Sequence, residues 1–216
     1  SVLLGAKRGL RDFTKLVVVK RLHERFAIDA VTVEMFLDEA RLAARLSNPH
    51  VVQTYEVGEV DGAPYLTMEY LEGQPLSRLL RVMTKAGQVM PLSIAVRIFS
   101  DVLEGLQHAH TLRDFDGTSL NVIHRDISPG NIFLTYDGHA KLLDFGVARA
   151  RTHVHQTLAG VVKGKLAYLA PEVARSQTYD HRADLWGIGI VMWESLAGER
   201  LFKAESDAAT LGNVLH

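Results

Sequence analysis

Apolar residues near the start of the chain come in short runs separated by polar breaks, a pattern typical of β-strands. β-Branched and other apolar side chains fill residues 2–4 and 16–20, with a turn-like stretch between them. Two further runs cover residues 51–57 and 63–70, and the Asp-Gly pair that joins them is a strong hairpin signal. The pattern therefore predicts four strands in this part of the chain.

One long helix is predicted between the second and the third strand. Phe36, Leu37 and Ala40 belong to a set of apolar residues at helical spacing, and charged residues fill the positions between them. We expect this helix to cover residues 26–46. The Asn-Pro pair at residues 48–49 would end it.

Helical periodicity dominates the rest of the chain. Residues 76–83 and 93–112 are predicted helices, and residues 183–197 form an apolar helix that we expect to be buried on most sides. The chain therefore divides into a strand-rich domain at residues 1–70 and a helix-rich domain at residues 71–216.

Two short strands and a loop are predicted inside the helix-rich domain. Residues 132–134 and 141–143 are apolar and flank an Asp-Gly turn. Residues 149–166 follow neither the helical nor the strand period, so we expect a loop there. The predicted fold class is α+β, with a small sheet and one main helix followed by a larger, mostly helical part.

Composition narrows the possible functions. The 216 residues suit one large domain or a two-lobed unit. A net charge of −1 gives no general attraction to nucleic acid, and the lack of cysteine excludes disulfides and a cysteine nucleophile. Because no apolar run reaches the length of a membrane span and no secretory signal opens the chain, we expect a cytoplasmic domain without a membrane segment. A longer parent protein with its own membrane anchor stays possible.

Four motifs follow one another in a fixed order. Lys20 ends a predicted strand and Glu39 lies in the following helix. His-Arg-Asp-Ile-Ser-Pro-Gly-Asn occupies residues 124–131, Asp-Phe-Gly residues 144–146, and Ala-Pro-Glu residues 170–172. Each motif alone occurs by chance, but the ordered set resembles the protein kinase signature over nearly the whole chain. The resemblance implies the two-lobed kinase fold, with a small antiparallel N-terminal sheet and a larger helical C-terminal lobe.

The resemblance also implies the chemistry, which is transfer of the γ-phosphate of ATP to a protein hydroxyl. Lys20 would contact the α- and β-phosphates, and Glu39 would hold its ammonium group in place. Asp126 would accept or orient the proton of the attacking hydroxyl. Asn131 and Asp144 would bind Mg²⁺, which prefers oxygen ligands. Taken alone, each residue also fits an ordinary solvated strand end, helix face, loop or turn, and the joint spacing argues against those readings.

A site for the adenine ring is implied at the junction of the two predicted domains. Backbone groups of Glu69 and Leu71 would bond the adenine edge, and Met68 would be the gatekeeper side chain. Val18 stands where the family usually has alanine, and its extra methyl groups should tighten the pocket. Phe133 completes the expected nucleotide contacts.

Arg125 directly precedes the expected catalytic aspartate. This pattern is typical of kinases that are switched on when a loop threonine is phosphorylated, because the phosphate would bind the arginine and order the loop. Thr157 and Thr152 are the candidate acceptors, and Thr157 lies at the better distance from the Ala-Pro-Glu motif. An unmodified loop threonine remains the alternative.

Two positions depart from the kinase pattern. Ser128 stands where Ser/Thr kinases usually have a lysine, and Gly130 where tyrosine kinases usually have an arginine. Lys165, in contrast, stands where Ser/Thr kinases usually have a threonine. We hypothesise that Lys165 reaches the γ-phosphate site and replaces the missing catalytic cation. In the alternative reading Lys165 points to solvent and Ser128 weakens catalysis.

The ends of the chain form a further departure. The glycine-rich loop of the family, Gly-x-Gly-x-x-Gly, would lie before Val2, and the last helices of the family would follow His216. We therefore expect a kinase core without its first strand, its glycine-rich loop and its last helices.

The function expected from these residues is that of a bacterial Ser/Thr protein kinase that uses ATP and Mg²⁺. A pseudokinase that acts as a scaffold is the main rival, although Lys20, Asp126 and Asp144 are all present. A small-molecule phosphotransferase is a second rival, and the Ala-Pro-Glu motif with its long preceding segment argues for a protein substrate instead. The sequence does not predict the substrate, the upstream signal or the oligomeric state.

Overall fold

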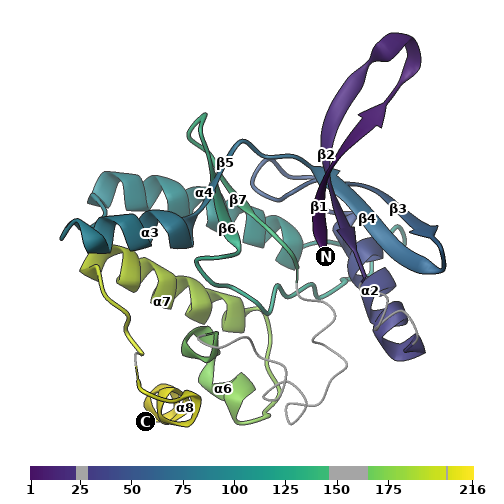
Figure 1. Cartoon of the computed structure of the whole chain (residues 1–216). Coiled ribbons are helices and arrows are strands. Elements are labelled where there is room, and N and C mark those ends of the chain that lie inside the picture. Colours follow the sequence, from purple (N-terminus) through teal and green to yellow (C-terminus); the bar gives the residue numbers. More distant parts are fainter. Residues whose placement is uncertain (23–28, 146–164, 203) are drawn as a thin grey trace.

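The computed structural model describes residues 1–22, 29–145, 165–202 and 204–216, and these form two parts (Figure 1). The N-terminal part is an antiparallel sheet with one helix against it. The C-terminal part consists of helices and a small three-stranded sheet. This is the α+β architecture that the sequence predicts.

The N-terminal sheet has the strand order β1-β2-β4-β3, and all neighbouring strands are antiparallel. The β1–β2 hairpin extends well beyond the rest of the sheet (Figure 1). The predicted Asp-Gly turn is confirmed, since Asp61 and Gly62 have φ angles of 50° and 73° and the primed hairpin turns require positive values. The strands are β1 Val2–Arg8, β2 Thr14–Arg21, β3 Thr54–Val60 and β4 Ala63–Glu69.

The third strand begins later than predicted. Residues 51–53 lie outside β3 because this stretch turns toward the second sheet instead. Val51 forms a bridge with Leu142, and the amide of Val52 donates to the carbonyl of Leu142 over 2.9 Å. This pairing joins the end of the N-terminal part to the C-terminal part.

The predicted long helix is present as α2, Ala30–Ala43, and it is shorter at both ends than residues 26–46. Asp29 has extended backbone and caps the helix by accepting bonds from the amides of Val31 and Thr32. Residues 26–28 of the prediction lie outside the described residues. Phe36 is buried against the sheet, which fixes the face that α2 turns toward the cleft.

The helices of the C-terminal part pack around a core in which Phe99, Val102 and Val191 are almost fully buried. The three predicted helices are confirmed as α3, α4 and α7, whereas α6 and α8 were not predicted. The last predicted helix is buried on most sides, as expected, and is exposed only along one stripe that includes Leu185 and Trp193, at 44% and 38%. The helices are α3 Leu76–Lys85, α4 Leu92–His110, α6 Pro171–Ala174, α7 Arg182–Ala197 and α8 Asp207–Leu215. Within the described ranges, no helix has both the length and the apolar character needed to cross a membrane.

The second sheet lies between the two parts and has the antiparallel order β5-β6-β7. Its strands are β5 Gly73–Pro75, β6 Ile132–Thr135 and β7 Ala140–Leu142. The β6 and β7 strands and their turn at Gly138 were predicted, and β5 was not. The hairpin brings the residues before β6 next to those after β7, so that the amide of Leu143 donates to the carbonyl of Asn131 over 2.9 Å. The predicted domain boundary at residue 70 stays a prediction.

Candidate active site

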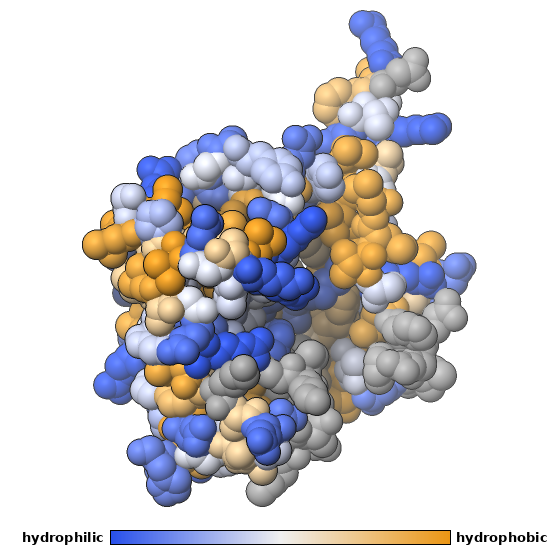
Figure 2. Space-filling view, turned by 60° about the vertical axis from the view of Figure 1, so that its left-hand side comes forward, coloured by the Kyte–Doolittle hydropathy of each residue, from blue (hydrophilic) through white to orange (hydrophobic). Residues whose placement is uncertain are grey.

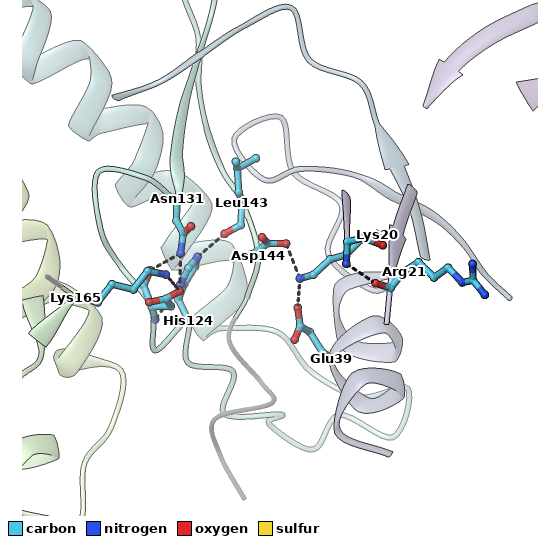
Figure 3. Close-up of polar contacts among 10 residues, drawn as sticks. Lys20, Arg21, Glu39, His124, Asn131, Leu143, Asp144 and Lys165 are labelled. Carbon is cyan, nitrogen blue, oxygen red and sulfur yellow. Dashed lines mark hydrogen bonds and ion pairs between the residues drawn. The ribbon is translucent and has the colours of Figure 1, made fainter. Parts of the chain in front are cut away.

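Lys20 lies between two carboxylates at the junction of the two parts (Figure 3). Its Nζ is 2.9 Å from Glu39 Oε1 on α2 and 2.8 Å from Asp144 Oδ1, which follows β7. The other acidic residues of α2 face elsewhere, since Glu34 and Asp38 pair with Arg41 on the exposed side. Among the three acidic residues of α2, the geometry therefore selects Glu39, as the sequence predicts.

The electrostatics of this cluster favour an added cation. Burial acts to lower the pKa of Lys20, but the charges of Asp144 and Glu39 outweigh it and raise that pKa, so the ammonium stays charged. Burial also raises the pKa of Glu39, and the attraction of Lys20 offsets only part of the effect. Two carboxylates around one ammonium leave net negative charge in a partly buried site, which a bound metal ion would neutralise.

The loop at residues 124–131 is held from below by α7. One carboxylate there, Asp184, is only 1% exposed and accepts bonds from the backbone amides of His124 and Arg125, each over 2.8 Å. His110 at the end of α4 binds the same carboxylate over 2.8 Å. The contribution of His110 was missed because nothing in its local sequence pattern distinguishes it.

His124 connects this loop to the strand that precedes Asp144. Its Nε2 donates to the carbonyl of Leu143 over 2.9 Å, and its Nδ1 accepts from the amide of Asp126 over 3.3 Å. Burial lowers the pKa of His124, so the ring is neutral with its proton on Nε2. The buried ring thus fixes the positions of both Asp126 and Asp144.

Asp126 is contacted from two directions (Figure 3). The side-chain amide nitrogen of Asn131 donates to its carbonyl over 2.7 Å and to its Oδ2 over 2.9 Å. The Nζ of Lys165 is 2.5 Å from the same Oδ2. Lys165 therefore points toward Asp126 and not into solvent.

The residues expected around the adenine ring come from the two inner strands of the N-terminal sheet, from the segment after β4 and from β6. Met68 of β4 lies opposite Val18 of β2, and Leu71 packs on the same apolar cluster. Phe133 lies on β6, opposite Pro75. Figure 2 shows the molecule hollowed between its two parts, with hydrophobic side chains gathered on the side of the sheet.

The side chain of Glu69, at the end of β4, is bound by two neighbours. Its Oε1 accepts from Lys141 Nζ over 2.7 Å and from the amide of Gln53 over 2.8 Å, while the Glu69 amide donates to the carbonyl of Gln53. The contact with Lys141 joins the end of β4 to β7, and it was not predicted. Any contact of Glu69 with adenine would therefore come from its backbone carbonyl.

Two site residues have left-handed backbone. Arg125 has a φ of 65° and Asp144 a φ of 46°. Residues other than glycine, asparagine and aspartate rarely adopt this conformation, and such strain persists only where the surroundings enforce it. Arg125 is therefore the strained residue, and the bond from its amide to Asp184 holds it in place, which marks its loop as a functional candidate.

Arg125 lies beside a pocket in front of Asp126. Its guanidinium carbon is 5.9 Å from the centre of the Tyr179 ring, and its buried Nε has no hydrogen-bond partner within the described part of the chain. Lys165 and Tyr168 also line this pocket. Thr152 and Thr157, the predicted phosphorylation sites, lie outside the described residues.

The donor atoms of the site suit magnesium bound together with a phosphate ligand. The Asp144 carboxylate and the Asn131 amide oxygen are hard oxygen donors, and Mg²⁺ commonly takes one or two protein ligands plus phosphates and water. Elsewhere in the described residues, no group of three or more histidine, aspartate or glutamate side chains is placed to hold a metal alone.

Comparison with known proteins agrees with this geometry. The protein kinase domain family matches residues 6–216. Tyrosine-protein kinase MasK of Myxococcus xanthus is 42% identical over 215 residues, which cover 100% of this chain and 33% of MasK. Serine/threonine-protein kinase PknH of Mycobacterium bovis is 37% identical over 206 residues, covering 95% of this chain and 32% of PknH. The probable serine/threonine-protein kinase pknA2 of Bifidobacterium longum is 33% identical over 205 residues, covering 94% and 26%.

The chain thus spans a third or less of the length of these relatives. The match nevertheless extends through both parts of the fold. It includes the strand lysine, its glutamate partner and the two loops that meet at Asp126 and Asp144. This chain therefore belongs to the protein kinase family.

Proposed function

We propose that the chain is the catalytic part of a bacterial signalling kinase that transfers the γ-phosphate of ATP to serine and threonine hydroxyls of proteins. The observation that carries this proposal is the position of Lys20, shared between Glu39 and Asp144 next to the Asp126–Asn131 pair. ATP is the phosphoryl donor and Mg²⁺ the cofactor. A cytoplasmic location would fit the need for ATP.

Lys20 binds the α- and β-phosphates in this proposal. Glu39 keeps the ammonium directed into the cleft, and the raised pKa of Lys20 keeps it protonated. Asp144 and Asn131 would hold Mg²⁺, which neutralises phosphate charge when it is bound. Val18, Met68, Leu71 and Phe133, with the backbone of Glu69, would enclose the adenine; the full set of nucleotide-contacting residues is Val18, Lys20, Glu39, Met68, Glu69, Leu71, Asn131, Phe133 and Asp144.

Asp126 orients the acceptor. Its carboxylate is held by Asn131, so it presents a fixed oxygen to the hydroxyl of the substrate. The hydroxyl oxygen forms a bond to the γ-phosphorus as the bond from that phosphorus to its bridging oxygen breaks. The hydroxyl proton passes to Asp126, and ADP leaves.

Serine and threonine are favoured as acceptors by the pattern of the whole chain and by the names of relatives such as PknH. Tyrosine is a second candidate, because MasK is named a tyrosine-protein kinase. Ser128 and Gly130 lack the cations that usually mark the two classes, so these positions do not separate them.

Regulation would act through Arg125. Its buried, strained position beside Asp126 is suited to a phosphate on the preceding segment, with Thr157 or Thr152 as the modified residue. Such a phosphate would give the guanidinium a charged partner and place the segment for substrate binding.

The proposal is tested with radiolabelled ATP, Mg²⁺, casein as a generic protein acceptor and an aminoglycoside as a small acceptor. We expect label on casein, and acid hydrolysis should yield phosphoserine or phosphothreonine. Asp126→Asn should lower turnover by at least about 10²-fold. The control is Asp116→Asn, on an exposed loop, which should leave turnover unchanged.

Other outcomes would contradict parts of this proposal. Label found only on tyrosine would overturn the acceptor assignment, and label on the aminoglycoside alone would overturn the protein substrate. Nucleotide binding without any transfer would favour a pseudokinase.

A further inference from the structure

The carboxylate of Asp126 is in contact with a cation that comes from outside its own loop. Lys165 directly precedes the short helix η3, Leu166–Tyr168, and reaches across to Asp126 Oδ2 over 2.5 Å. In sequence it lies 39 residues away from Asp126. The base and the cation therefore belong to two separate elements.

The loop that carries Asp126 supplies no cation after it. Residues 127–130 are Ile-Ser-Pro-Gly, and the Ser128 side chain is buried and uncharged. Lys20, on the opposite side of the cleft, already binds Glu39 and Asp144. Among the described residues, Lys165 is the cation placed on the Asp126 carboxylate.

Charge on the transferring phosphoryl group spreads over its three outer oxygens, and catalysis depends on fixed positive groups next to them. A lysine ammonium has three N–H donors. Among the described residues, one N–H of Lys165 is used by Asp126, and the other two can serve oxygens of a phosphoryl group held next to that carboxylate. The side chain is 27% exposed, so it also faces the open pocket in front of Asp126.

We propose that Lys165 is the catalytic cation for the transferring phosphoryl group and that it is supplied by η3 in place of the catalytic loop. This inference rests on the proposed kinase function and adds a residue to it. In this proposal the position of η3 determines where the catalytic cation lies relative to Asp126.

The packing of η3 against α7 supports the catalytic role of Lys165. Ala167 is buried, and the hydroxyl of Tyr168 donates to Glu194 Oε2 of α7 over 2.8 Å. Helix α7 also carries Asp184, which fixes the loop of Asp126. Helix α7 therefore holds both the loop of Asp126 and η3. The distance between Asp126 and Lys165 is kept as long as η3 stays packed against α7.

The first test compares Lys165→Met and Lys165→Arg with the unchanged chain. Loss of the cation should lower kcat by about 10²–10³-fold, the usual effect of removing one transition-state donor. The Kd for Mg-ADP should stay unchanged, whereas binding of ADP with aluminium fluoride, a mimic of the transferring group, should weaken strongly in Lys165→Met. Lys165→Arg should retain part of both. Lys85→Met, at the exposed end of α3, serves as the matched control.

A second test separates charge from packing. The chain contains no cysteine, so Lys165→Cys introduces a unique thiol. Alkylation with 2-bromoethylamine restores an ammonium at nearly the original length, and iodoacetamide adds a neutral group. Recovery of kcat with the first reagent and not with the second supports the proposal.

Equal recovery with both reagents, or unchanged kcat and aluminium fluoride binding in Lys165→Met, would overturn the role of Lys165. Those results leave the kinase function intact provided that Asp126→Asn abolishes transfer. If the unchanged chain transfers no phosphate at all, the proposed function itself fails.

Discussion

His124 is fully enclosed, and both ring nitrogens are used within the site. Its pKa lies below the ordinary value of 6.5 because burial disfavours the charged ring. Below pH 6.5 the unfolded chain therefore binds a proton at this position that the folded chain does not bind. By linkage, folding stability is lost as the pH falls through this range.

We therefore predict that the free energy of unfolding, measured by urea titration, decreases as the pH falls below 6.5. His124→Asn should flatten this slope even if it lowers stability at every pH. His216→Asn, an exposed change at the end of the described chain, should leave the slope as it is. An unchanged slope in His124→Asn would show that the other histidines account for the effect.

At the scale of residues, the kinase motifs identify side chains that the fold does bring together. Lys20, Glu39 and Asp144 meet as the ordered motifs imply, and Lys165 meets Asp126. Residues without a motif escaped prediction. Lys141 binds Glu69, which lies 72 residues away in the sequence. The residues around Lys141 show only the pattern of an ordinary strand lysine.

At the scale of elements, α7 contains two glycines with opposite surroundings. A Cβ at Gly187 would lie 2.8 Å from the Cβ of Ile127 in the catalytic loop, whereas a Cβ at Gly189 would meet nothing within 4 Å. Gly187 thus permits the close approach of helix and loop, and Gly189 lies on the exposed stripe.

The two glycines give a matched pair of variants. Gly187→Ala should destabilise the fold by about 1–3 kcal/mol, as overpacking does, and should also reduce kcat by displacing the loop. Gly189→Ala should be neutral or stabilise by up to about 1 kcal/mol because alanine favours the helix. Thermal unfolding and steady-state kinetics check both. Equal effects of the two changes would refute the assigned contact.

The type of an element, helix or strand, could be predicted where the hydrophobic periodicity continued over many residues. The ends of the elements could not be predicted in this way. The helix at α2 was expected three residues beyond Ala43, because its periodicity continues past the point where the backbone leaves the helix. Strand β5 is three residues long and contains glycine and proline, so only its pairing with β6 defines it. These features depend on contacts distant in sequence.

At the scale of the whole molecule, a few polar contacts join the two parts. Lys20 with Asp144 and Lys141 with Glu69 both cross between them. A nucleotide bound at this junction would add contacts to both parts at once. Its binding should therefore stabilise the complete molecule and not one part alone.

We predict that Mg-ADP at about 100 times its Kd raises Tm by about 5–10 °C. Removal of the metal with EDTA should abolish most of the shift, since the metal would link the phosphates to the carboxylate. Asp144→Asn should lose the metal-dependent part and keep a smaller shift with ADP alone. Differential scanning calorimetry would show a single transition that moves as a unit, and two separately moving transitions would contradict the prediction.

The two-part α+β architecture follows from the sequence, because a strand-rich stretch precedes a helix-rich one and the motif order matches the kinase family. The placement of the parts does not, since it depends on contacts such as that of Val52 with Leu142. The pattern of residues 149–166 also left the position of η3 open, and with it the position of Lys165.

The support of the catalytic loop by α7 has a consequence for how such chains diverge. Asp184 and Gly187 lie within one turn of a single helix, and together they hold the loop without help from the N-terminal sheet. Changes in that sheet that keep Lys20 and its contact with Asp144 therefore alter how tightly nucleotide is held while the backbone of the loop around Asp126 persists. A chimera that takes the N-terminal part of a relative should therefore keep the catalytic loop in place, provided that the new part supplies a lysine and a glutamate at the positions of Lys20 and Glu39.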